Sequence, residues 1–270
     1  MFGSAIVAVT EFISIFASTL NTPIIGNMST PTGPRTLSQS TEEMRSHYLK
    51  CGVSVDCVIF GFDEGDLKIL LVRRGVEPYQ GQWALPGDLV DPDEDLNVAA
   101  VRVLNELTGL NNVYMKQVLT FGEVHRHPLG RVFTVAYYSL IRIDKYKVNE
   151  GNWAEEARWW SLKEIPDLPF DHNLIVETVS ENFRSQVRRQ PIGFELLPNA
   201  FTLTEIQHLY EAVLQTNFDV RNFRKKLLAT GLLIDTDTFT RYNAHRPARL
   251  YRFDKRKYDR WSKTGFSLNM

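Results

Sequence analysis

Hydrophobic and polar residues change their spacing several times along this chain, and each change predicts a different element of secondary structure. Residues 53–62 and 67–73 are dense in aliphatic and β-branched residues, and the polar group 63–66 separates them. Two such runs around a short polar turn predict a β-hairpin. Three later runs of the same kind predict strands over residues 113–124, 131–143 and 157–162.

Two segments of this region repeat apolar residues at every third and fourth position, which is the spacing of an amphipathic helix. The first follows a proline and three acidic residues at 92–95, where the helix dipole favours negative charge, and stops at Gly109, which suits a left-handed C-cap. The second runs from His172 to about Arg188, with Asp171 as its candidate N-cap residue. Strands and helices in this order predict an α/β sandwich over residues 50–188.

The last part of the chain is organised differently. Residues 190–198 are expected to be a linker. Thr202 and Glu205 have the spacing of a capping box, and apolar residues follow them at helical spacing, so we expect a helix to begin there. Asp219 is expected to cap a second helix, residues 220–229, which ends at Gly231.

In this second helix Phe223, Leu227 and Leu228 are expected to face the core, whereas its cationic residues are expected to be exposed. Two short strands, residues 232–234 and 248–253, should then enclose a polar loop. Two helices joined by a tight turn and followed by a hairpin are organised as a winged helix-turn-helix, which is a DNA-binding unit.

Composition adds an asymmetry of charge. The chain has 270 residues, 43% of them hydrophobic, and a formal net charge of −1, as in ordinary globular proteins. Residues 201–270 contain 13 Lys and Arg against 7 Asp and Glu, so the tail is basic and the remainder is acidic. This distribution indicates that the tail meets a polyanion. Cys51 and Cys57 form neither a metal-binding spacing nor a disulfide framework, which favours a reducing, cytoplasmic location.

Residues 1–47 are expected to be a disordered leader. Their apolar run, residues 5–20, is interrupted by Glu11 and follows no Lys or Arg, so neither a membrane anchor nor a signal peptide is expected. Residues 21–46 are rich in Ser, Thr, Pro and Asn, a composition that does not order itself. The alternative is that the true start lies at Met28 or Met44.

The first predicted helix and the loop before it resemble a known motif. Residues 87–110 are similar to the Nudix box, the loop–helix signature of Nudix hydrolases. The box glycine falls on Asp88, with Gly87 just before it, and two helix glutamates of the box fall on Val103 and Leu107. Aligned on Arg102 and Gly109, the segment retains Glu94, Arg102, Leu104, Glu106, Gly109 and Leu110.

In the active family the helix glutamates hold a divalent metal that bridges a diphosphate. Hard cations need oxygen ligands, and Val103 and Leu107 offer none. The resemblance therefore implies a Nudix fold without catalysis, with no catalytic residue, no metal site and no cofactor. It also implies an ion pair between Glu94 and Arg102 that holds the fold, and it leaves open whether Glu106 is a vestige or an anchor for a ligand hydroxyl.

A Nudix domain followed by this tail resembles the Nudix-related transcriptional regulators. The resemblance implies a dimeric repressor or activator whose Nudix domain senses either an ADP-ribose-like nucleotide or a pentose such as arabinose. The box sequence of residues 102–109 is more similar to the sugar-responsive branch. The segments that carry the resemblance are residues 126–131, 135–137, 170–172, 201–205, 209–213, 221–226 and 246–252.

These observations predict a Nudix-type α/β/α sandwich with a C-terminal winged helix-turn-helix domain. The expected parts are a leader (1–47), a ligand-sensing Nudix-like domain (48–189), a linker (190–198) and a DNA-binding winged helix (199–265). The expected partners are a small-molecule effector, a double-stranded DNA operator and a second copy of the chain. A homodimer would place two tails on a palindrome.

The candidate ligand-binding residues are Arg73, Trp83, Glu106, Arg126, Arg131, Tyr137 and His172. The candidate DNA-binding residues are Arg221, Asn222, Arg224, Lys225, Lys226, Arg241 and Arg246. Plainer interpretations stay open, because a run of cations is usually a solvated face and aromatic residues on strands are more often core. Two other functions also stay open: an active Nudix hydrolase of a nucleotide sugar or dinucleotide diphosphate, and a tail that binds protein.

Overall fold

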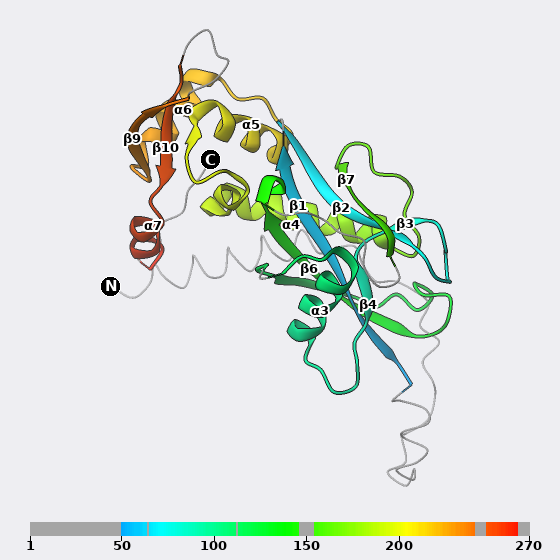
Figure 1. Ribbon diagram of the computed structural model, residues 1–270. Helices are drawn as coiled ribbons and strands as arrows, with labels where there is room; N and C mark the ends of the chain where they lie inside the picture. Colours follow the sequence, from blue (N-terminus) through cyan, green and yellow to red (C-terminus); the bar gives the residue numbers. More distant parts are fainter. Residues whose placement is uncertain (1–49, 64, 112, 146–153, 241–246, 264–270) are drawn as a thin grey trace, which may run out of the picture. The chain divides into compact units, whose positions relative to one another are not determined.

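The computed structural model describes residues 50–63, 65–111, 113–145, 154–240 and 247–263 (Figure 1). The expected leader and two DNA-binding candidates, Arg241 and Arg246, lie outside the described residues.

A mixed sheet forms the centre of the first part (Figure 1). Its strand order is β3-β2-β1-β6-β5, with β4 paired to β1 and β7 paired to β2. The central strand β1 runs parallel to β6 and antiparallel to β2 and β4. The strands are β1 (Gly52–Asp63), β2 (Asp66–Arg74), β3 (Trp83–Ala84), β4 (Gly87–Leu89), β5 (Lys116–Phe121), β6 (Val132–Ile141) and β7 (Ala154–Ser161).

Two helices cover the two faces of this sheet. Alternate residues of β1 point to opposite faces, so they pack under one helix or the other. Val58 and Phe60 belong to the core under α4 (His172–Arg189), whereas Cys57 and Ile59 belong to the core under α3 (Leu96–Thr108). Strands buried on both faces read as continuous apolar runs, which is why the pattern of residues 53–62 was informative. The predicted α/β/α sandwich is confirmed.

The boundaries of both helices agree with their sequence signals. The box helix α3 ends at Gly109, whose φ of 72° lies in the left-handed region that a C-cap requires. The helix α4 begins at His172, directly after Asp171, as expected. However, the Asp171 side chain makes no capping hydrogen bond, so only the position of this N-cap was predicted correctly.

The C-terminal part is a winged helix, whose three-stranded sheet has the order β8-β10-β9. The predicted capping box is present, because Thr202 Oγ1 accepts from Glu205 N at 3.1 Å and Glu205 Oε2 accepts from Thr202 N at 2.6 Å. Asp219 caps the next helix by accepting from Asn222 N at 2.8 Å. The elements are η2 (Pro191–Leu196), β8 (Phe201–Thr202), α5 (Leu203–Leu214), α6 (Val220–Ala229), β9 (Leu233–Phe239), β10 (Arg249–Phe253) and α7 (Lys255–Ser262).

Two expectations for this part were wrong. The first of the two strands, expected over residues 232–234, extends to Phe239, because its polar residues pair with β10 along the outer edge of the sheet. Leu228 is not in the core: it is 45% exposed, whereas Phe223 and Leu227 are buried as expected.

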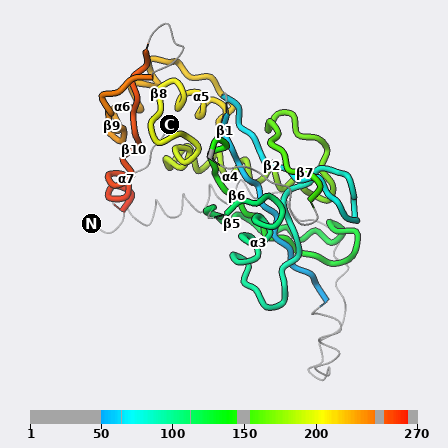
Figure 2. The backbone as a smooth tube through the Cα atoms, viewed as in Figure 1, coloured from blue at the N-terminus to red at the C-terminus, as the bar shows by residue number. Residues whose placement is uncertain are grey.

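One hydrophobic core runs from the sheet into the winged helix. It contains Phe60 of β1, Phe183 and Val187 of α4, and Leu209 and Val213 of α5. Residues 190–198, which were expected to be a linker, include η2, and its Pro191, Phe194 and Leu196 are buried in the protein. Figure 2 follows the chain from α4 through this segment into α5. The helix α4 therefore packs against both the sheet and the winged helix.

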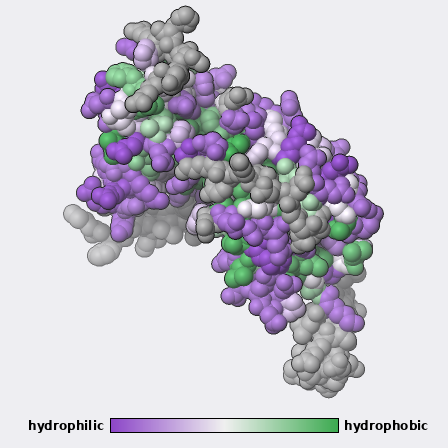
Figure 3. Space-filling view, viewed as in Figure 1, coloured by the Kyte–Doolittle hydropathy of each residue, from purple (hydrophilic) through white to green (hydrophobic). Residues whose placement is uncertain are grey.

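Polar residues gather on the visible face over α7 (Figure 3), which exposes Lys255, Arg256 and Arg260.

Among the helices of the described ranges, none has the length and apolar character that crossing a membrane requires.

Candidate functional site

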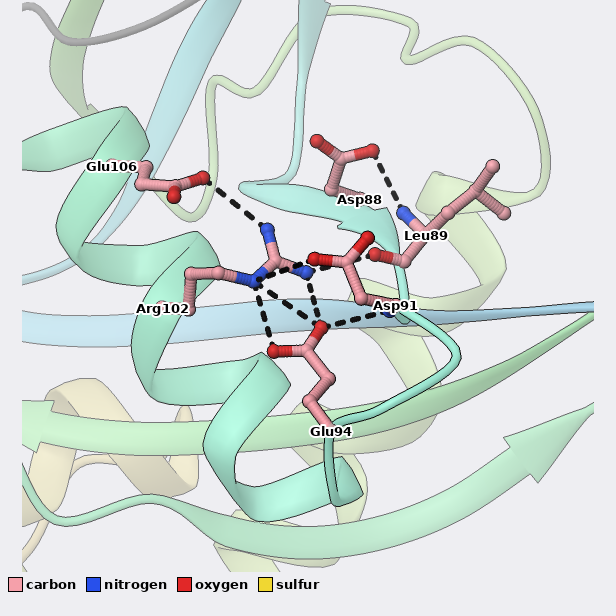
Figure 4. Close-up of polar contacts among 6 residues, drawn as sticks. All are labelled: Asp88, Leu89, Asp91, Glu94, Arg102 and Glu106. Carbon is pink, nitrogen blue, oxygen red and sulfur yellow. Dashed lines mark hydrogen bonds and ion pairs between the residues drawn. The ribbon is translucent and has the colours of Figure 1, made fainter.

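Arg102 joins the box helix to the loop before it (Figure 4). Its Nε donates to Glu94 Oε2 at 2.9 Å, its Nη1 to Glu106 Oε2 at 3.2 Å, and its Nη2 to the Leu89 carbonyl at 3.0 Å. Glu94 also accepts from the Asp91 amide at 2.9 Å. The hydrogen bonds from Arg102, followed by the one from Asp91, lower the pKa of Glu94 to about 2. The predicted ion pair between Glu94 and Arg102 is confirmed.

The two box positions that lack glutamate are buried. Val103 is 0% exposed and Leu107 is 1% exposed, and both pack in the core with Val55 and Tyr137. A carboxylate at either position would be buried among apolar side chains, which is costly unless a cation compensates it. Glu94 and Glu106 are already paired with Arg102. Within the described ranges, no group of three or more His, Cys, Asp or Glu side chains is placed to hold a metal ion.

A second polar cluster lies at the N-terminus of α4 and is centred on Arg126. Its guanidinium forms two hydrogen bonds with Asp171, from Nε to Oδ2 at 2.8 Å and from Nη2 to Oδ1 at 2.7 Å. Nη2 also lies 3.5 Å from Oδ2 of Asp56. The Asp171 carboxylate is thus occupied by Arg126, which explains why it does not cap the helix that it precedes.

Asp56 is buried at the bottom of this cluster. Its Oδ2 accepts from Thr134 Oγ1 at 2.6 Å, and its Oδ1 lies 3.4 Å from Nε2 of His172. His172 Nδ1 accepts from the Leu85 amide at 3.1 Å, so the proton of a neutral His172 is on Nε2, facing Asp56. Burial raises the pKa of Asp56, but His172, Thr134 and Arg126 together outweigh it and hold that pKa below its ordinary value. Asp56 is therefore a carboxylate.

Gly87 makes room for this carboxylate. A Cβ at Gly87 would overlap Oδ1 of Asp56 and lie 2.9 Å from the Val55 carbonyl. Asp56 cannot retreat easily, because Thr134, His172 and Arg126 hold it.

We expect Gly87→Ala to lower the free energy of unfolding by about 3 kcal/mol, the scale of overpacking a filled interior. Gly52→Ala on the same strand as Asp56 is the control, since its Cβ would meet only ordinary contacts at 3.4 Å. Urea unfolding of both variants measures the difference. Equal stability of the two variants would contradict the close packing of Gly87 on Asp56.

Aromatic rings border the cluster on one side. Phe170 stacks on His127, with ring centroids 5.1 Å apart and planes at 11°, and Tyr79 meets Phe170 edge-on at 4.8 Å. The Arg74 guanidinium lies 5.3 Å from the centre of the Phe170 ring. Burial, and then the positive charges of Arg126 and Arg74, lower the pKa of His127, which favours its uncharged form.

These groups surround a cavity of about 240 Å³, which we call the Arg126 pocket. Guanidinium groups suit phosphates, carboxylates accept hydrogen bonds from hydroxyls, and aromatic rings stack on planar groups. The pocket thus combines the chemistry needed for a phosphorylated sugar carrying a ring. Its lining includes Asp56, Arg74, Glu77, Asp88, Arg126, His127, Phe170 and His172.

Of the seven candidate ligand-binding residues, Arg126 and His172 lie in the Arg126 pocket. Tyr137 is fully buried in the core, where its hydroxyl lies 3.0 Å from Asn97 Oδ1. Trp83 packs edge-on against Trp160 at 5.4 Å, as strand aromatics commonly do.

The other three candidates make contacts elsewhere. Glu106 is paired with Arg102. Arg73 donates from Nε to the Gly81 carbonyl at 3.1 Å. Arg131 precedes β6, donates to the Gly122 carbonyl at 2.8 Å and lies 4.1 Å from the centre of the Phe133 ring.

Sequence reasoning missed Asp56, Arg74, Thr134 and Phe170 as parts of this site. Asp56 had a usable signal, because it is a charged residue inside an otherwise apolar run on a central strand. A buried charge requires partners, and a search for them would have pointed to the nearby polar positions of neighbouring strands.

The helix α6 presents the candidate DNA-binding surface. Arg221, Asn222, Lys225 and Lys226 are exposed, as expected for residues that meet DNA. Arg224 turns instead towards α5, where its Nη2 donates to Thr204 Oγ1 at 3.0 Å. Four of the five candidates on this helix are therefore exposed.

Comparisons with known proteins agree with both parts of the chain. A family model for the NUDIX domain matches residues 51–182, and one for the NrtR DNA-binding winged helix domain matches residues 193–253. The chain is 35% identical to the ADPR responsive transcriptional repressor NtrR of Acinetobacter baylyi, over 80% of this chain and 87% of that protein. It is also 33% identical to the ADP-ribose pyrophosphatase of Methanocaldococcus jannaschii, over 48% of this chain and 73% of that enzyme.

Among solved structures, Shewanella oneidensis NrtR in complex with a 27mer DNA is 31% identical to this chain. The two structures align with a TM-score of 0.62, over 74% of this chain and 93% of the other. A degenerate box, an exposed basic helix in a winged helix, and these relatives along most of the chain agree with one another. The protein belongs to the Nudix-related transcriptional regulators, in which a Nudix domain precedes a DNA-binding winged helix of the NrtR type.

Proposed function

We propose that this protein is a transcriptional repressor that binds operator DNA through its winged helix and releases it when the Nudix domain binds ADP-ribose, without hydrolysing this effector. The observation that carries the proposal is the burial of Val103 and Leu107 in a Nudix domain that is joined to an exposed basic helix. The box helix thus contributes to the core in place of metal-binding carboxylates.

The Arg126 pocket is the proposed effector site. Arg126 and Arg74 suit a diphosphate, and Asp56 suits ribose hydroxyls. Its volume of about 240 Å³ accommodates only part of ADP-ribose, so the remainder would extend over the exposed Val76 and Leu129 at the rim. A pentose, which the box sequence favoured, finds no support among the relatives described above, two of which are named for ADP-ribose. A pentose also carries neither a phosphate for the guanidinium groups nor a base for the rings.

Through α4, effector binding can act on the winged helix. Asp171 and His172 begin this helix beside the pocket, and towards its other end Arg184 Nε donates to the Val213 carbonyl of α5 at 3.2 Å. The shared core around Phe183 and Val213 ties the same helix to the winged helix. An effector that binds only one arrangement of α4 would shift the protein towards that arrangement. As a homodimer, the protein would then present two winged helices at a changed spacing.

The test is a titration of the full chain with a duplex that it selects from a random DNA pool. Fluorescence anisotropy should show binding that weakens steeply with salt, because phosphate contacts release counterions. ADP-ribose should then reverse the binding, whereas arabinose should not. If ADP-ribose leaves a bound operator in place, the proposed effector is wrong even though DNA binding stands.

We expect no diphosphate hydrolysis above about 0.01 per second with magnesium or manganese, far below the typical enzymatic rate of about 10 per second. Val103 and Leu107 cannot ligate a metal, and Glu94 and Glu106 are held by Arg102. Release of ribose phosphate and AMP from ADP-ribose is the measurement, with an active ADP-ribose pyrophosphatase as positive control. The alternative is that the protein is an enzyme, and its similarity to the ADP-ribose pyrophosphatase supports that alternative. A turnover of about one per second would establish enzymatic hydrolysis.

A further inference from the structure

The helix α6 exposes a leucine that the core does not explain. Leu228 is 45% exposed and belongs to neither of the two hydrophobic core clusters, although Leu227 beside it is fully buried. At this end of the helix, the leucine that faces the core is Leu227. The apolar side chain of Leu228 is therefore available for a contact with a partner.

The geometry of α6 places Leu228 among the cations. With about 3.6 residues per turn, residues seven apart lie two turns apart on the same side, so Leu228 is in line with Arg221. Lys225 lies between them along this line. Phe223 and Leu227 occupy the opposite, buried side. Arg224 binds Thr204 of α5, so it also faces the protein body. The exposed face therefore has a stripe of two cations and one leucine.

DNA is the partner that this stripe fits. Arg221 and Lys225 match its phosphates and base edges in charge, and the second helix of a helix-turn-helix lies in the major groove, where side chains of its exposed face can reach base edges. The apolar group that the major groove presents is the C5-methyl of thymine. An aliphatic side chain in the stripe has this methyl as its complement.

We propose that Leu228 is a specificity-determining residue that contacts the C5-methyl group of one thymine in each operator half-site. The proposal rests on the assignment of α6 as the helix that enters the groove. It adds a contact that reads an A·T pair without a hydrogen bond.

Deoxyuridine offers a direct test, because it removes only this methyl group from a thymine. The operator is a duplex selected from a random pool by the full chain, and each thymine is replaced in turn. With the wild-type protein, one position per half-site should weaken binding about fourfold, the effect of exposing one methyl-sized group. In Leu228→Ala the same replacement should change the affinity by less than about 1.5-fold, as expected when the interaction is already lost.

Leu174→Ala is the matched control, since Leu174 is a 53% exposed leucine on α4. It should keep the wild-type response to every deoxyuridine. Circular dichroism and thermal unfolding should show both variants folded, because neither side chain is buried.

The outcomes separate this inference from the function on which it rests. If Leu228→Ala responds to every deoxyuridine as the wild type does, Leu228 reads no thymine and the inference is overturned. The same holds if no deoxyuridine weakens wild-type binding. If the wild-type chain selects no duplex at all, DNA binding itself fails, and this inference fails with it.

Discussion

Replacing Arg221 and Lys225 with alanine together is expected to lower operator affinity at least about a thousandfold. Each contact to a base or phosphate contributes about 1–3 kcal/mol, and a homodimer would lose each contact twice. Both side chains are exposed on α6, so their removal leaves the core that contains Phe223 and Leu227 intact. Anisotropy titrations at two salt concentrations should also show a smaller salt dependence than in the wild type.

The matched control removes two positive charges from the same part of the chain. Lys255→Ala with Arg260→Ala changes two exposed residues of α7 and alters the net charge by the same amount. We expect at most about a threefold loss for this variant, which is a general electrostatic effect. A loss as large as that of the α6 variant would mean that α6 is not the helix in the groove.

Arg126→Lys is expected to raise the concentration of ADP-ribose needed for operator release at least about tenfold. Lysine retains the positive charge, but it lacks the planar set of donors with which a guanidinium can bind a phosphate while it stays paired with Asp171. Because the charge is kept, the buried Asp56 and the partly buried Asp171 keep a cation beside them. Operator binding without effector should change little, since Arg126 lies in the Nudix domain. The measurement is operator release as a function of added ADP-ribose.

Two further variants sharpen this test. Arg131→Lys changes an arginine of the same segment that binds the carbonyls of Gly122 and Glu123 rather than the pocket, and it should respond as the wild type does. Asp171→Asn should act in the opposite direction to Arg126→Lys, because it weakens the hold on Arg126 and leaves the guanidinium freer to bind a phosphate. Asparagine also serves well as an N-cap residue, so α4 should persist. Equal responses of all three variants would remove Arg126 from the effector site.

Much of this architecture was readable from the sequence, because its signals are local. A continuous apolar run predicted β1, and helical spacing with suitable end residues predicted α3 and α4 to within a residue or two. The capping box of Thr202 and Glu205 spans only four residues, and it formed as expected. The pair of Glu94 and Arg102 was also predictable, since a known motif specifies both its residues and their spacing.

Only the tertiary structure decided the partners of polar residues that lie far apart in the chain. Arg126 and Asp171 are 45 positions apart, and only the packing of a loop against the start of α4 brings them together. Asp171 makes this contact instead of the capping hydrogen bond that was expected, because two hydrogen bonds to a buried guanidinium are stronger than one to a backbone amide. No local pattern carries information about such distant partners.

The choice between neighbouring residues was likewise made by packing. Helical spacing allowed both Leu227 and Leu228 to face inward, and the sequence did not distinguish them. In the folded protein Leu227 is buried and Leu228 is 45% exposed. Residue types and their periods thus determined by themselves which elements form and in what order. The distances between side chains from different elements, on which the Arg126 pocket and the exposed face of α6 depend, follow only from how those elements pack, because packing energy is shared among residues far apart in the chain.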